Sequence, residues 1–335
     1  MKIVIIEKDI LYSLLEEAFG RRAAALESDT RKRGALRLFN GFTEGCRELA
    51  IDLLGKTVVI QDYSPTSKSW DFLPDFIVEK LPFVQAVVLK KRCAENPQAR
   101  NGVIVYGEKV DTFVEEHAVR YAVDLTMNHD NGFYSDTRFL RKYLLENMRG
   151  KTLLNTFAYT GSLGVAAAAG GAEFVLQTDL SNKFMSQSYR SASLNGFAFT
   201  RKNFRCGDFF PVTASLRKAG ALFDCVIVDP PFFSTTNGGV VDLAKNPLNV
   251  INKVRPLVAD NGILIAVNNS LYLSGKDFLE AINSISRDGY LQFETAIPIP
   301  GDFCCCTGNT QTLYPADPAP FNHPTKIAVL RVRRR

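Results

Sequence analysis

The sequence predicts an α/β fold with a mostly parallel sheet, and three observations lead to this prediction. Residues 151–179 read as a strand, a glycine turn, a helix and a second strand, the unit that joins parallel strands. The same alternation of strand-like and helix-like segments continues to residue 287. Two apolar runs, 291–296 and 325–332, then close the chain without a helix between them, which favours an antiparallel edge.

Length and composition predict a globular protein of more than one domain. The 335 residues exceed a typical single domain, and the hydrophobic fraction of 46% and charged fraction of 22% are ordinary. Acids and turn formers cluster near residues 107–120, where we expect a boundary. The predicted parts are an N-terminal strand and helix segment at 1–36, a small α+β domain at 37–116, and the α/β domain at 117–335.

The first two parts contain a helix, several strands and basic residues. Helical spacing of Leu11, Leu14, Leu15 and Phe19 predicts an amphipathic helix, and apolar runs at 57–60, 83–89 and 102–106 predict strands. The basic residues between 21 and 33 are either a solvated face or a contact surface for nucleic-acid phosphates, and a second cationic cluster follows at 90–92. The single Trp70 is expected to pack down rather than to stack on a base.

Charge, hydropathy and cysteine usage exclude several classes of protein. The net charge of +5 is compatible with a polyanionic partner, and no apolar run is long enough to span a bilayer. The N-terminus lacks a cleavable leader, so we expect a cytoplasmic protein. The seven cysteines show no paired framework and the three histidines no ligand spacing, which predicts reduced thiols and no metal. The oligomeric state stays open, a homodimer included.

The glycine turn of residues 151–179 predicts a cofactor site. Parallel strands end at one edge of the sheet, where α/β folds bind ligands, and the second strand ends on Asp179, a carboxylate suited to two ribose hydroxyls. The dinucleotide fingerprint is absent because the turn offers only Gly161 and Gly164. A nucleoside without a pyrophosphate fits better, and S-adenosylmethionine is the common one. The alternative is a glycine turn that only packs a helix on a sheet.

A second motif, at residues 223–233, predicts a reactive corner. A buried strand ends in Asp229-Pro230-Pro231-Phe232, and two prolines force the chain out of the sheet at the edge where the glycine turn lies. The corner combines a carboxylate, outward backbone carbonyls and an aromatic ring. These groups suit methyl transfer to an exocyclic amine, with Asp229 and Pro230 holding the amine and Phe232 stacking on a flipped base. The alternative is a turn that only ends a strand.

Six ordered segments resemble one enzyme family, the class I S-adenosylmethionine-dependent ribosomal RNA methyltransferases related to the bacterial enzymes that methylate cytosine C5 in 23S ribosomal RNA. They are RLFNGFTEGCRELAIDLLGKTVVIQDY (37–63), NGFYSDTR (131–138), LLNTFAYTGSLGVAAAAGGA (153–172), TDLS (178–181), LNGF (194–197) and VDPPFF (228–233). The resemblance implies a Rossmann-like seven-stranded sheet, preceded by a small α+β domain that is a candidate for RNA binding. The family often carries an N-terminal PUA domain, which we do not expect in this chain.

The resemblance also implies roles for individual residues. Phe157, Tyr159, Gly161 and Gly164 would form the cofactor loop, Asp179 would take the ribose hydroxyls, Asp208 would lie near the adenine, and Asp229 would face the methionine end or the target. Phe133, Tyr134, Asp136 and Arg138 would close over the cofactor, with Arg138 pairing its carboxylate.

One departure from the family bears on the reaction. Cytosine C5 methylation needs a cysteine thiolate that attacks C6, and the C5 enzymes carry it in a Ser-Cys-Ser element after the fifth strand. The equivalent place here reads Asn268-Asn269-Ser270. We expect Cys225 inside the sheet, and one thiol of the run 304–306 is the alternative nucleophile. The Asp-Pro-Pro-Phe corner is compatible with methylation of an amino group or a ring nitrogen.

The predicted function is therefore an S-adenosylmethionine-dependent methyltransferase that acts on a base of RNA, most often ribosomal RNA in this family. A small-molecule methyltransferase would use the same cofactor half without the basic N-terminal segments. A non-catalytic RNA-binding or assembly protein on the same scaffold is the alternative from another class, which the missing cysteine favours. An NAD-dependent dehydrogenase is the third alternative, because the turn lacks the glycine fingerprint of dinucleotide-binding proteins.

Overall fold

The computed structural model describes residues 7–65, 70–127, 130–304 and 319–334. Contacts between Cα atoms divide the chain into two compact units. The first comprises Met1–Ser135 and Gly301–Leu313, and the second Asp136–Pro300 and Tyr314–Arg335. The division falls later in the chain than the predicted one at residue 116, and a returning segment that the sequence did not predict joins the first unit.

A five-stranded sheet forms the body of the first unit. The strands lie in chain order: β1 (Ala35–Asn40), β2 (Leu49–Leu54), β3 (Thr57–Asp62), β4 (Ala86–Lys91) and β5 (Val103–Gly107). Neighbours pair antiparallel except β3 and β4, which are parallel because helix α4 (Leu73–Lys80) crosses over between them. The apolar runs predicted at 57–60, 83–89 and 102–106 correspond to β3, β4 and β5.

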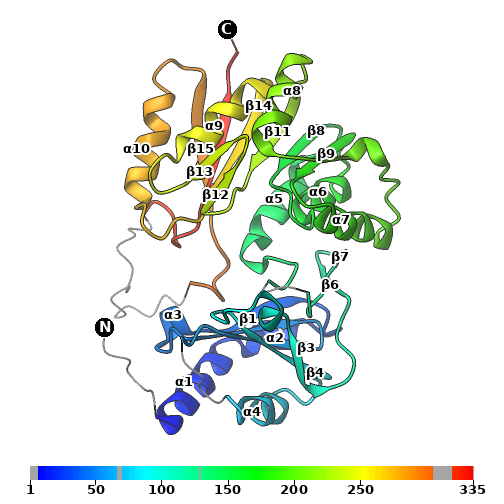
Figure 1. The fold of residues 1–335 in the computed structure, drawn as a ribbon, viewed down its shortest axis with the longest axis vertical. Helices are drawn as coiled ribbons and strands as arrows, with labels where there is room; N and C mark the ends of the chain where they lie inside the picture. Colours follow the sequence, from blue (N-terminus) through cyan, green and yellow to red (C-terminus); the bar gives the residue numbers. More distant parts are fainter. Residues whose placement is uncertain (1–6, 66–69, 128–129, 305–318, 335) are drawn as a thin grey trace. The chain divides into compact units, whose positions relative to one another are not determined.

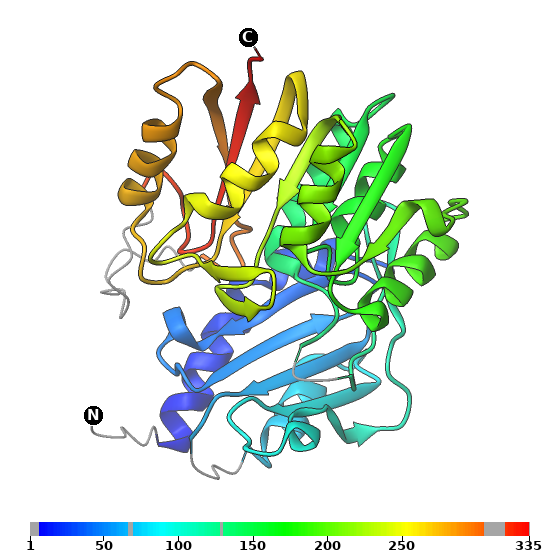
Figure 2. The same ribbon diagram turned by 45° about the horizontal axis from the view of Figure 1, so that its top comes forward.

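Helices α1 (Lys8–Arg21) and α4 pack on this sheet and bury its apolar core. Leu11, Leu15 and Phe19 point inward from α1, as their helical spacing predicts, and Phe76 of α4 meets Phe19 with ring centroids 5.4 Å apart. Figure 2 shows α1 lying along the blue strands of this unit. Trp70 is buried in the same core, so packing rather than exposure is confirmed for it. The strand predicted before α1 lies outside the described residues.

Three short elements and one hairpin complete the first unit. They are α2 (Ala23–Ser28), α3 (Gly41–Glu44), the 3-10 helix η1 (Pro97–Arg100), and the antiparallel pair β6 (Phe113–Glu116) and β7 (Val119–Ala122). The returning segment is held by buried Arg22, which donates hydrogen bonds to both Glu44 carboxylate oxygens and to the Asp302 carbonyl. The Arg22 side chain therefore joins two parts of the unit that are far apart in sequence.

The second unit contains a seven-stranded sheet (Figure 1). Its strands lie in the order β10-β9-β8-β11-β14-β16-β15. Their bounds are β8 (Thr152–Thr156), β9 (Phe174–Asp179), β10 (Phe204–Cys206), β11 (Phe223–Val228), β14 (Val258–Asn268), β15 (Leu291–Ile297) and β16 (Lys326–Val332). The predicted α/β fold with a Rossmann-like seven-stranded sheet is confirmed.

The antiparallel edge predicted from the last two apolar runs is confirmed. The last strand, β16, pairs antiparallel with both β14 and β15, so it lies inside the sheet and β15 forms the edge. Burial explains this order because β16 is buried along nearly its whole length, whereas most residues of β15 are exposed or half-buried. The near-continuous apolar run of β16 was the signal for an interior strand.

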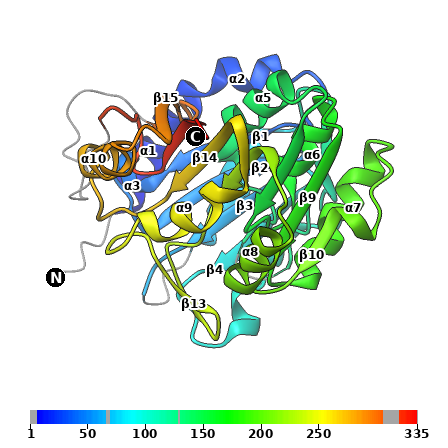
Figure 3. The same ribbon diagram turned by 90° about the horizontal axis from the view of Figure 1, so that it is seen from above.

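Helices cover both faces of this sheet. The helices are α5 (Arg138–Asn147), α6 (Ser162–Ala169), α7 (Asn182–Leu194), α8 (Phe209–Lys218), α9 (Leu248–Val254) and α10 (Gly275–Ile285), with 3-10 turns η2 (Ser135–Thr137), η3 (Arg201–Asn203) and η4 (Arg255–Leu257). Figure 3 shows α8, α9 and α10 on one side and α5, α6 and α7 on the other. Apolar side chains of α8, α9 and α10 form one buried core with alternate residues of the strands.

Helices α5 and α8 and the hairpin of β12 (Phe233–Thr236) and β13 (Gly239–Asp242) were not predicted from the sequence. Phe209, Val212 and Leu216 of α8 are buried at helical spacing after Asp208, whose side chain caps the helix, so the signal was present. Among the described helices, none is both long and apolar enough to cross a bilayer.

Candidate functional site

The carboxyl ends of the parallel strands bring two acidic corners to one edge of the seven-stranded sheet. β8 lies between β9 and β11, so the loop after β8 is flanked by Asp179 at the end of β9 and by Asp229 directly after β11. Both acids come from the second unit, and the sequence predicted both. Their surroundings differ.

The loop after β8 has a strained backbone. Phe157, Tyr159 and Gly161 have φ angles of 53°, 51° and 76°, in the left-handed region that non-glycine residues seldom adopt. Backbone hydrogen bonds hold this shape: the Ala158 N–H donates to the Thr178 carbonyl at 2.9 Å, and the Gly161 N–H to the Ala158 carbonyl at 2.7 Å. The Phe157 ring stacks on Phe209 with centroids 4.5 Å apart. Such held strain is typical of a loop that binds a ligand.

Under the loop lies a buried polar ladder that the sequence analysis missed. Asn155 donates to the Gln177 side-chain oxygen at 3.3 Å, and the Gln177 amide donates to the Ser188 hydroxyl at 2.6 Å. The loop packs so closely on this ladder that a Cβ at Gly161 would lie 2.0 Å from the Ser188 Oγ. A Cβ at Gly164 would lie 2.5 Å from the Gln177 side chain. Both positions therefore require glycine.

Asp179 is tied to the backbone around it. Its Oδ2 accepts the Tyr159 N–H at 2.8 Å, and its Oδ1 accepts the Ser181 N–H at 2.9 Å. Burial raises the pKa of this carboxyl, and these hydrogen bonds act in the opposite direction. Because each carboxylate oxygen has a second lone pair, Asp179 can still accept two hydroxyls while it fixes the loop.

Asp208 has a structural task that the sequence did not predict. Its carboxylate accepts the Phe210 N–H at 2.9 Å as the cap of α8, and the Gly238 N–H of the β12–β13 hairpin at 3.2 Å. Burial raises the pKa of Asp208, but these hydrogen bonds and one from Thr236 outweigh it and lower the pKa. The side chain thus joins α8 to the hairpin. A contact to an adenine, implied by the resemblance, stays a prediction.

Asp229 accepts no hydrogen bond from the residues that the structure describes. The carboxyl is half-buried beside β11, and Asp136 is close enough to act on it. Burial, followed by the negative charge of Asp136, raises the pKa of Asp229 to about 7. The group is therefore near the midpoint of its titration at neutral pH. A carboxyl with this pKa can take up a proton there, which suits a general base.

The loop after β14 supports the Asp229 corner. The Asn269 side chain donates a long hydrogen bond of 3.4 Å to the carbonyl of Pro230, and its buried Oδ1 has no partner among the described residues. Buried Lys326 donates to the Ser270 carbonyl at 2.9 Å, and burial lowers its pKa to about 8. That this loop is equivalent to the family's Ser-Cys-Ser element, as the resemblance implies, stays a prediction.

Exposed aromatic side chains surround the same corner. Phe232, predicted as a stacking residue, is 39% exposed and lies 6.1 Å from the ring of Tyr272, which is 66% exposed. Phe233 begins the β12–β13 hairpin and is exposed as well. Tyr272 follows β14 and was missed because nothing in its local sequence marks it. Aromatic faces that stay in solvent are suited to stacking on a planar ligand.

The remaining predicted residues are divided between the units. Arg138 is half-buried at the start of α5 in the second unit, as is Asp136 just before it. Phe133 and Tyr134 belong to the first unit, where Phe133 is buried beside Tyr121 and Tyr134 is exposed. That these four residues close over the cofactor stays a prediction.

The structure also shows where Cys225 and Cys304 lie. Cys225 is fully buried in β11, as predicted, and burial raises the pKa of its thiol to about 12, so it is not a nucleophile. Cys304 is half-buried in the first unit, and Cys305 and Cys306 lie outside the described residues.

Comparison with known proteins identifies the family. The sequence profile described as "S-adenosylmethionine-dependent methyltransferase" matches residues 84–306. The chain is 30% identical over 288 residues to the protein named "Putative ribosomal RNA large subunit methyltransferase YwbD" of Bacillus subtilis, covering 84% of this chain and 72% of that protein. It is 26% identical over 291 residues to "Ribosomal RNA large subunit methyltransferase I" of Aliivibrio fischeri, covering 85% and 73%.

A solved structure agrees on the fold. The crystal structure titled "SMU.776, a putative methyltransferase complexed with SAH" superposes with a TM-score of 0.81 at 23% identity, covering 99% of this chain and 83% of that one. At this identity the likeness shows the architecture, while the family profile and the relatives show membership. The protein therefore belongs to the family of S-adenosylmethionine-dependent methyltransferases.

Proposed function

We propose that this enzyme transfers the methyl group of S-adenosylmethionine to a base of ribosomal RNA at the Asp229 corner. The observation that carries the proposal is the combination, at the ends of β11 and β14, of a carboxyl with a pKa of about 7 and the exposed rings of Phe232 and Tyr272. The rings suit a base that leaves its stack, and the carboxyl suits removal of a proton from it.

The cofactor fits the residues of the glycine loop. The cofactor supplies a sulfonium-bound methyl group, and the Asp179 carboxylate retains lone pairs for the ribose hydroxyls. The absence of a side chain at Gly161 and Gly164 keeps the loop close to β9 and α7, since any Cβ would displace Gln177 or Ser188. We assign Phe157 and Tyr159 to the same loop because their left-handed backbones set its course.

The target atom is a nitrogen in this proposal. Transfer to cytosine C5 requires a thiolate near the ring, but the resemblance puts Asn269 in the place of the family's cysteine, and Cys225 is buried with a pKa of about 12. A C5 mechanism would therefore need a thiol of the run 304–306. A base nitrogen needs no covalent activation. The bound cofactor would supply the methyl group by cleavage of its S–CH3 bond, with the neutral thioether as the leaving group. The nitrogen that takes the methyl group would lose one proton, which the ionised Asp229 accepts. Pro230 contributes a backbone carbonyl beside Asp229 that Asn269 holds in place.

Ribosomal RNA is the substrate class that the relatives support. YwbD and the Aliivibrio fischeri enzyme are both named as methyltransferases of large-subunit ribosomal RNA. The net charge of +5 suits a polyanion, and a base-sized aromatic site suits RNA better than a small aliphatic acceptor. Action on ribosomal RNA or a ribosomal particle would also agree with the expected cytoplasmic location.

The test is methyl transfer in vitro. Purified protein is incubated with S-adenosylmethionine labelled in the methyl group and with transcribed large-subunit ribosomal RNA, small-subunit ribosomal RNA or transfer RNA. We expect label in large-subunit ribosomal RNA, and nuclease digestion with mass spectrometry should place the methyl group on a base nitrogen. Binding of S-adenosylhomocysteine without transfer to any RNA would contradict the proposal. Label on cytosine C5 would contradict the assignment of the atom.

A further inference from the structure

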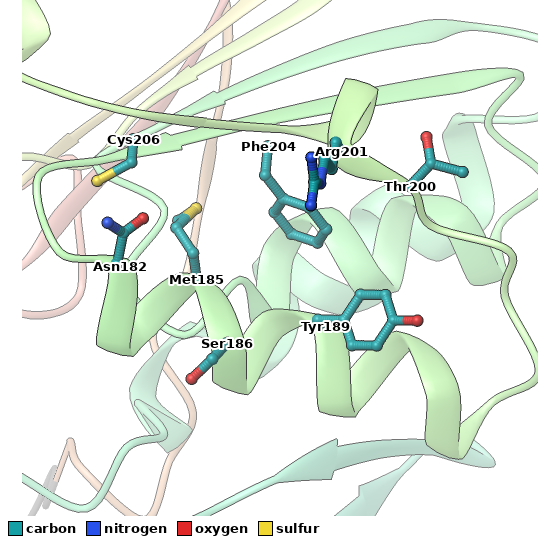
Figure 4. Close-up of a pocket in the computed structure, with 8 residues that line it drawn as sticks. All are labelled: Asn182, Met185, Ser186, Tyr189, Thr200, Arg201, Phe204 and Cys206. Atoms are coloured by element: carbon teal, nitrogen blue, oxygen red, sulfur yellow. The ribbon is translucent and has the colours of Figure 1, made fainter.

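The outer edge of the seven-stranded sheet carries a hollow that none of the groups discussed above uses. It has a volume of about 420 Å³ and lies between helix α7 and the edge strand β10 in the second unit. Asn182, Met185, Ser186, Tyr189, Thr200, Arg201, Phe204 and Cys206 line it (Figure 4). In Figure 4, Phe204 and Arg201 reach from the strand side toward α7, and Tyr189 lies below them. A volume of this size is in the range of small-ligand sites, roughly 300–1,000 Å³.

The segment that forms the hollow has an unbalanced charge. Residues 180–207 contain five basic residues and no acidic one. Lys183, Arg190, Arg201 and Lys202 are exposed, and Arg205 is half-buried. Such a run without acids is unusual in a chain whose 40 basic residues face 35 acidic ones. It produces a positive surface on one edge of the sheet.

These cations have no acidic partner in the part of the chain that the structure describes. Within the described residues, none of the five forms a salt bridge, and the side chains of Lys183, Arg201 and Lys202 also make no hydrogen bond. Arginines elsewhere behave differently: Arg22, Arg37 and Arg331 each pair with a carboxylate at 2.7 Å or less. An exposed cation without a protein partner is available to an external anion.

The hollow also offers a surface for a flat, apolar group. Tyr189 is 53% exposed, and its ring lies 6.4 Å from that of Phe204 at an angle of 60°. The polar residues Asn182, Ser186 and Thr200 also line the hollow. A site for single-stranded nucleic acid combines three components: cations that bind phosphates, aromatic rings that stack on a base, and polar groups that bind base edges.

We propose that the α7–β10 hollow binds an unpaired nucleotide of the substrate RNA, outside the methyl-transfer site, with Arg201 and Lys202 on the phosphates and Tyr189 on the base. This proposal rests on the proposed function, because it assigns a second contact to the same substrate. Single-stranded RNA is favoured over an acidic peptide because the aromatic surface adjoins the cations, and a peptide carboxylate would leave the rings unused.

The first experiment compares two double variants with the same loss of charge. Arg201→Ala/Lys202→Ala removes Arg201, which lines the hollow, and the exposed Lys202 next to it. Lys276→Ala/Arg287→Ala removes two exposed cations near β15, at the opposite edge of the same sheet. Affinity for transcribed large-subunit ribosomal RNA is measured at several salt concentrations, together with KM, kcat and the affinity for S-adenosylhomocysteine.

We expect the hollow variant to bind RNA roughly tenfold more weakly at moderate salt, with the slope of log affinity against log salt reduced by about 0.7–0.9 for each lost phosphate contact. KM for RNA should rise while kcat and S-adenosylhomocysteine affinity stay unchanged. Identical affinity and slope in the two double variants would overturn the inference.

A second pair of variants tests the base contact. Tyr189→Ala should weaken RNA binding roughly tenfold at every salt concentration, because stacking on a base is lost while the charge is not. Tyr189→Phe keeps the ring and should bind like the wild type. Equal binding by Tyr189→Ala and Tyr189→Phe would exclude stacking at this place.

The two proposals fail in distinguishable ways. A wild-type protein that methylates ribosomal RNA while the hollow variants match the β15-edge control leaves the proposed function intact and overturns the second contact alone. A wild-type protein that neither binds nor methylates ribosomal RNA overturns both.

Discussion

Asp179 and Asp229 end two strands of one sheet at the same edge, yet their surroundings differ. Asp179 accepts backbone N–H groups from Tyr159 and Ser181, and so fixes the shape of the glycine loop. Asp229 accepts no hydrogen bond within the described chain and has a pKa of about 7. A carboxylate held by N–H donors favours its charged form and serves as an anchor, whereas one without donors is poised to exchange a proton. We expect Asp179 to act in cofactor binding and Asp229 in chemistry.

The largest effect is expected from Asp229→Asn. The substitution keeps the shape of the side chain but removes the base, so kcat should fall about 10²–10⁴-fold. Calorimetry should find S-adenosylhomocysteine affinity close to that of the wild type.

Asp224→Asn is the matched control at the other end of β11. The Asp224 carboxylate accepts the Thr152 N–H and hydroxyl at 2.8 Å each, so this variant should lose stability but keep kcat. If Asp229→Asn and Asp224→Asn had the same kcat, Asp229 would have no role in the methyl-transfer reaction.

Asp179→Asn should give the opposite pattern. Hydrogen bonds to a charged acceptor contribute about 1.5–3 kcal/mol each, so S-adenosylhomocysteine should bind roughly 10–100-fold more weakly. At saturating cofactor, kcat should change much less than in Asp229→Asn. Isothermal titration and a methyl-transfer assay at two cofactor concentrations measure the split. Unchanged affinity for the cofactor would show that Asp179 only holds the backbone of the glycine loop and does not bind the cofactor.

The pH dependence of the rate sharpens the contrast. Because the pKa of Asp229 is about 7, the fraction that can accept a proton increases as pH rises through 7. The methyl-transfer rate should therefore rise about tenfold per pH unit below 7 and level off above it. A rate that is flat from pH 5.5 to 8 would contradict an ionised Asp229 as the base.

The same carboxyl affects stability with a defined sign. The pKa of Asp229 is raised in the folded state, so below about pH 4 the group is neutral whether the chain is folded or unfolded. Between about pH 4 and 7 the unfolded chain releases the proton first, and the free energy of unfolding falls as pH rises. Above about 7 the loss is complete. Asp229→Asn should lack this contribution, which chemical denaturation at pH 5 and 8 would reveal.

The sequence predicted much of the carboxyl edge of the seven-stranded sheet, because the motifs that mark this edge consist of residues adjacent in the chain. A strand followed by a glycine turn, and a strand ending in Asp-Pro-Pro, place Gly161 and Asp229 from residues adjacent in the chain. The ladder of Asn155, Gln177 and Ser188 could not be predicted, since it joins two strands and a helix through side chains of no periodic pattern. The ring of Tyr272 approaches Phe232 only through the pairing of β11 with β14.

Glycine substitutions test the anchored corner with a smaller effect. Gly161→Ala combines a left-handed backbone with a Cβ 2.0 Å from the Ser188 Oγ, and should lower the free energy of unfolding by about 2–5 kcal/mol. Gly150→Ala has a similar φ of 68° but no atom within 4 Å, so only the backbone cost of about 1–2 kcal/mol applies. If urea unfolding showed equal destabilisation of the two variants, the Ser188 and Gln177 side chains would move away from the added Cβ at little cost in free energy.

The smallest effect is expected from Asn269→Ala. Its hydrogen bond to the Pro230 carbonyl is long, at 3.4 Å, so a contribution of about 1 kcal/mol and a several-fold loss of kcat are expected. Single-turnover kinetics separate this loss from RNA binding, which should not change. A loss as large as that of Asp229→Asn would mean that Asn269 itself contacts the base.

The central claim is most directly tested by the modified nucleosides of ribosomal RNA from a strain that lacks the gene. Mass spectrometry should find one methylated base missing, with the methyl group on nitrogen, and a copy of the wild-type gene should restore it. A copy carrying Asp229→Asn, expressed at the same level, should not. Ribosomal RNA with an unchanged set of modifications, or full restoration by Asp229→Asn, would contradict the account.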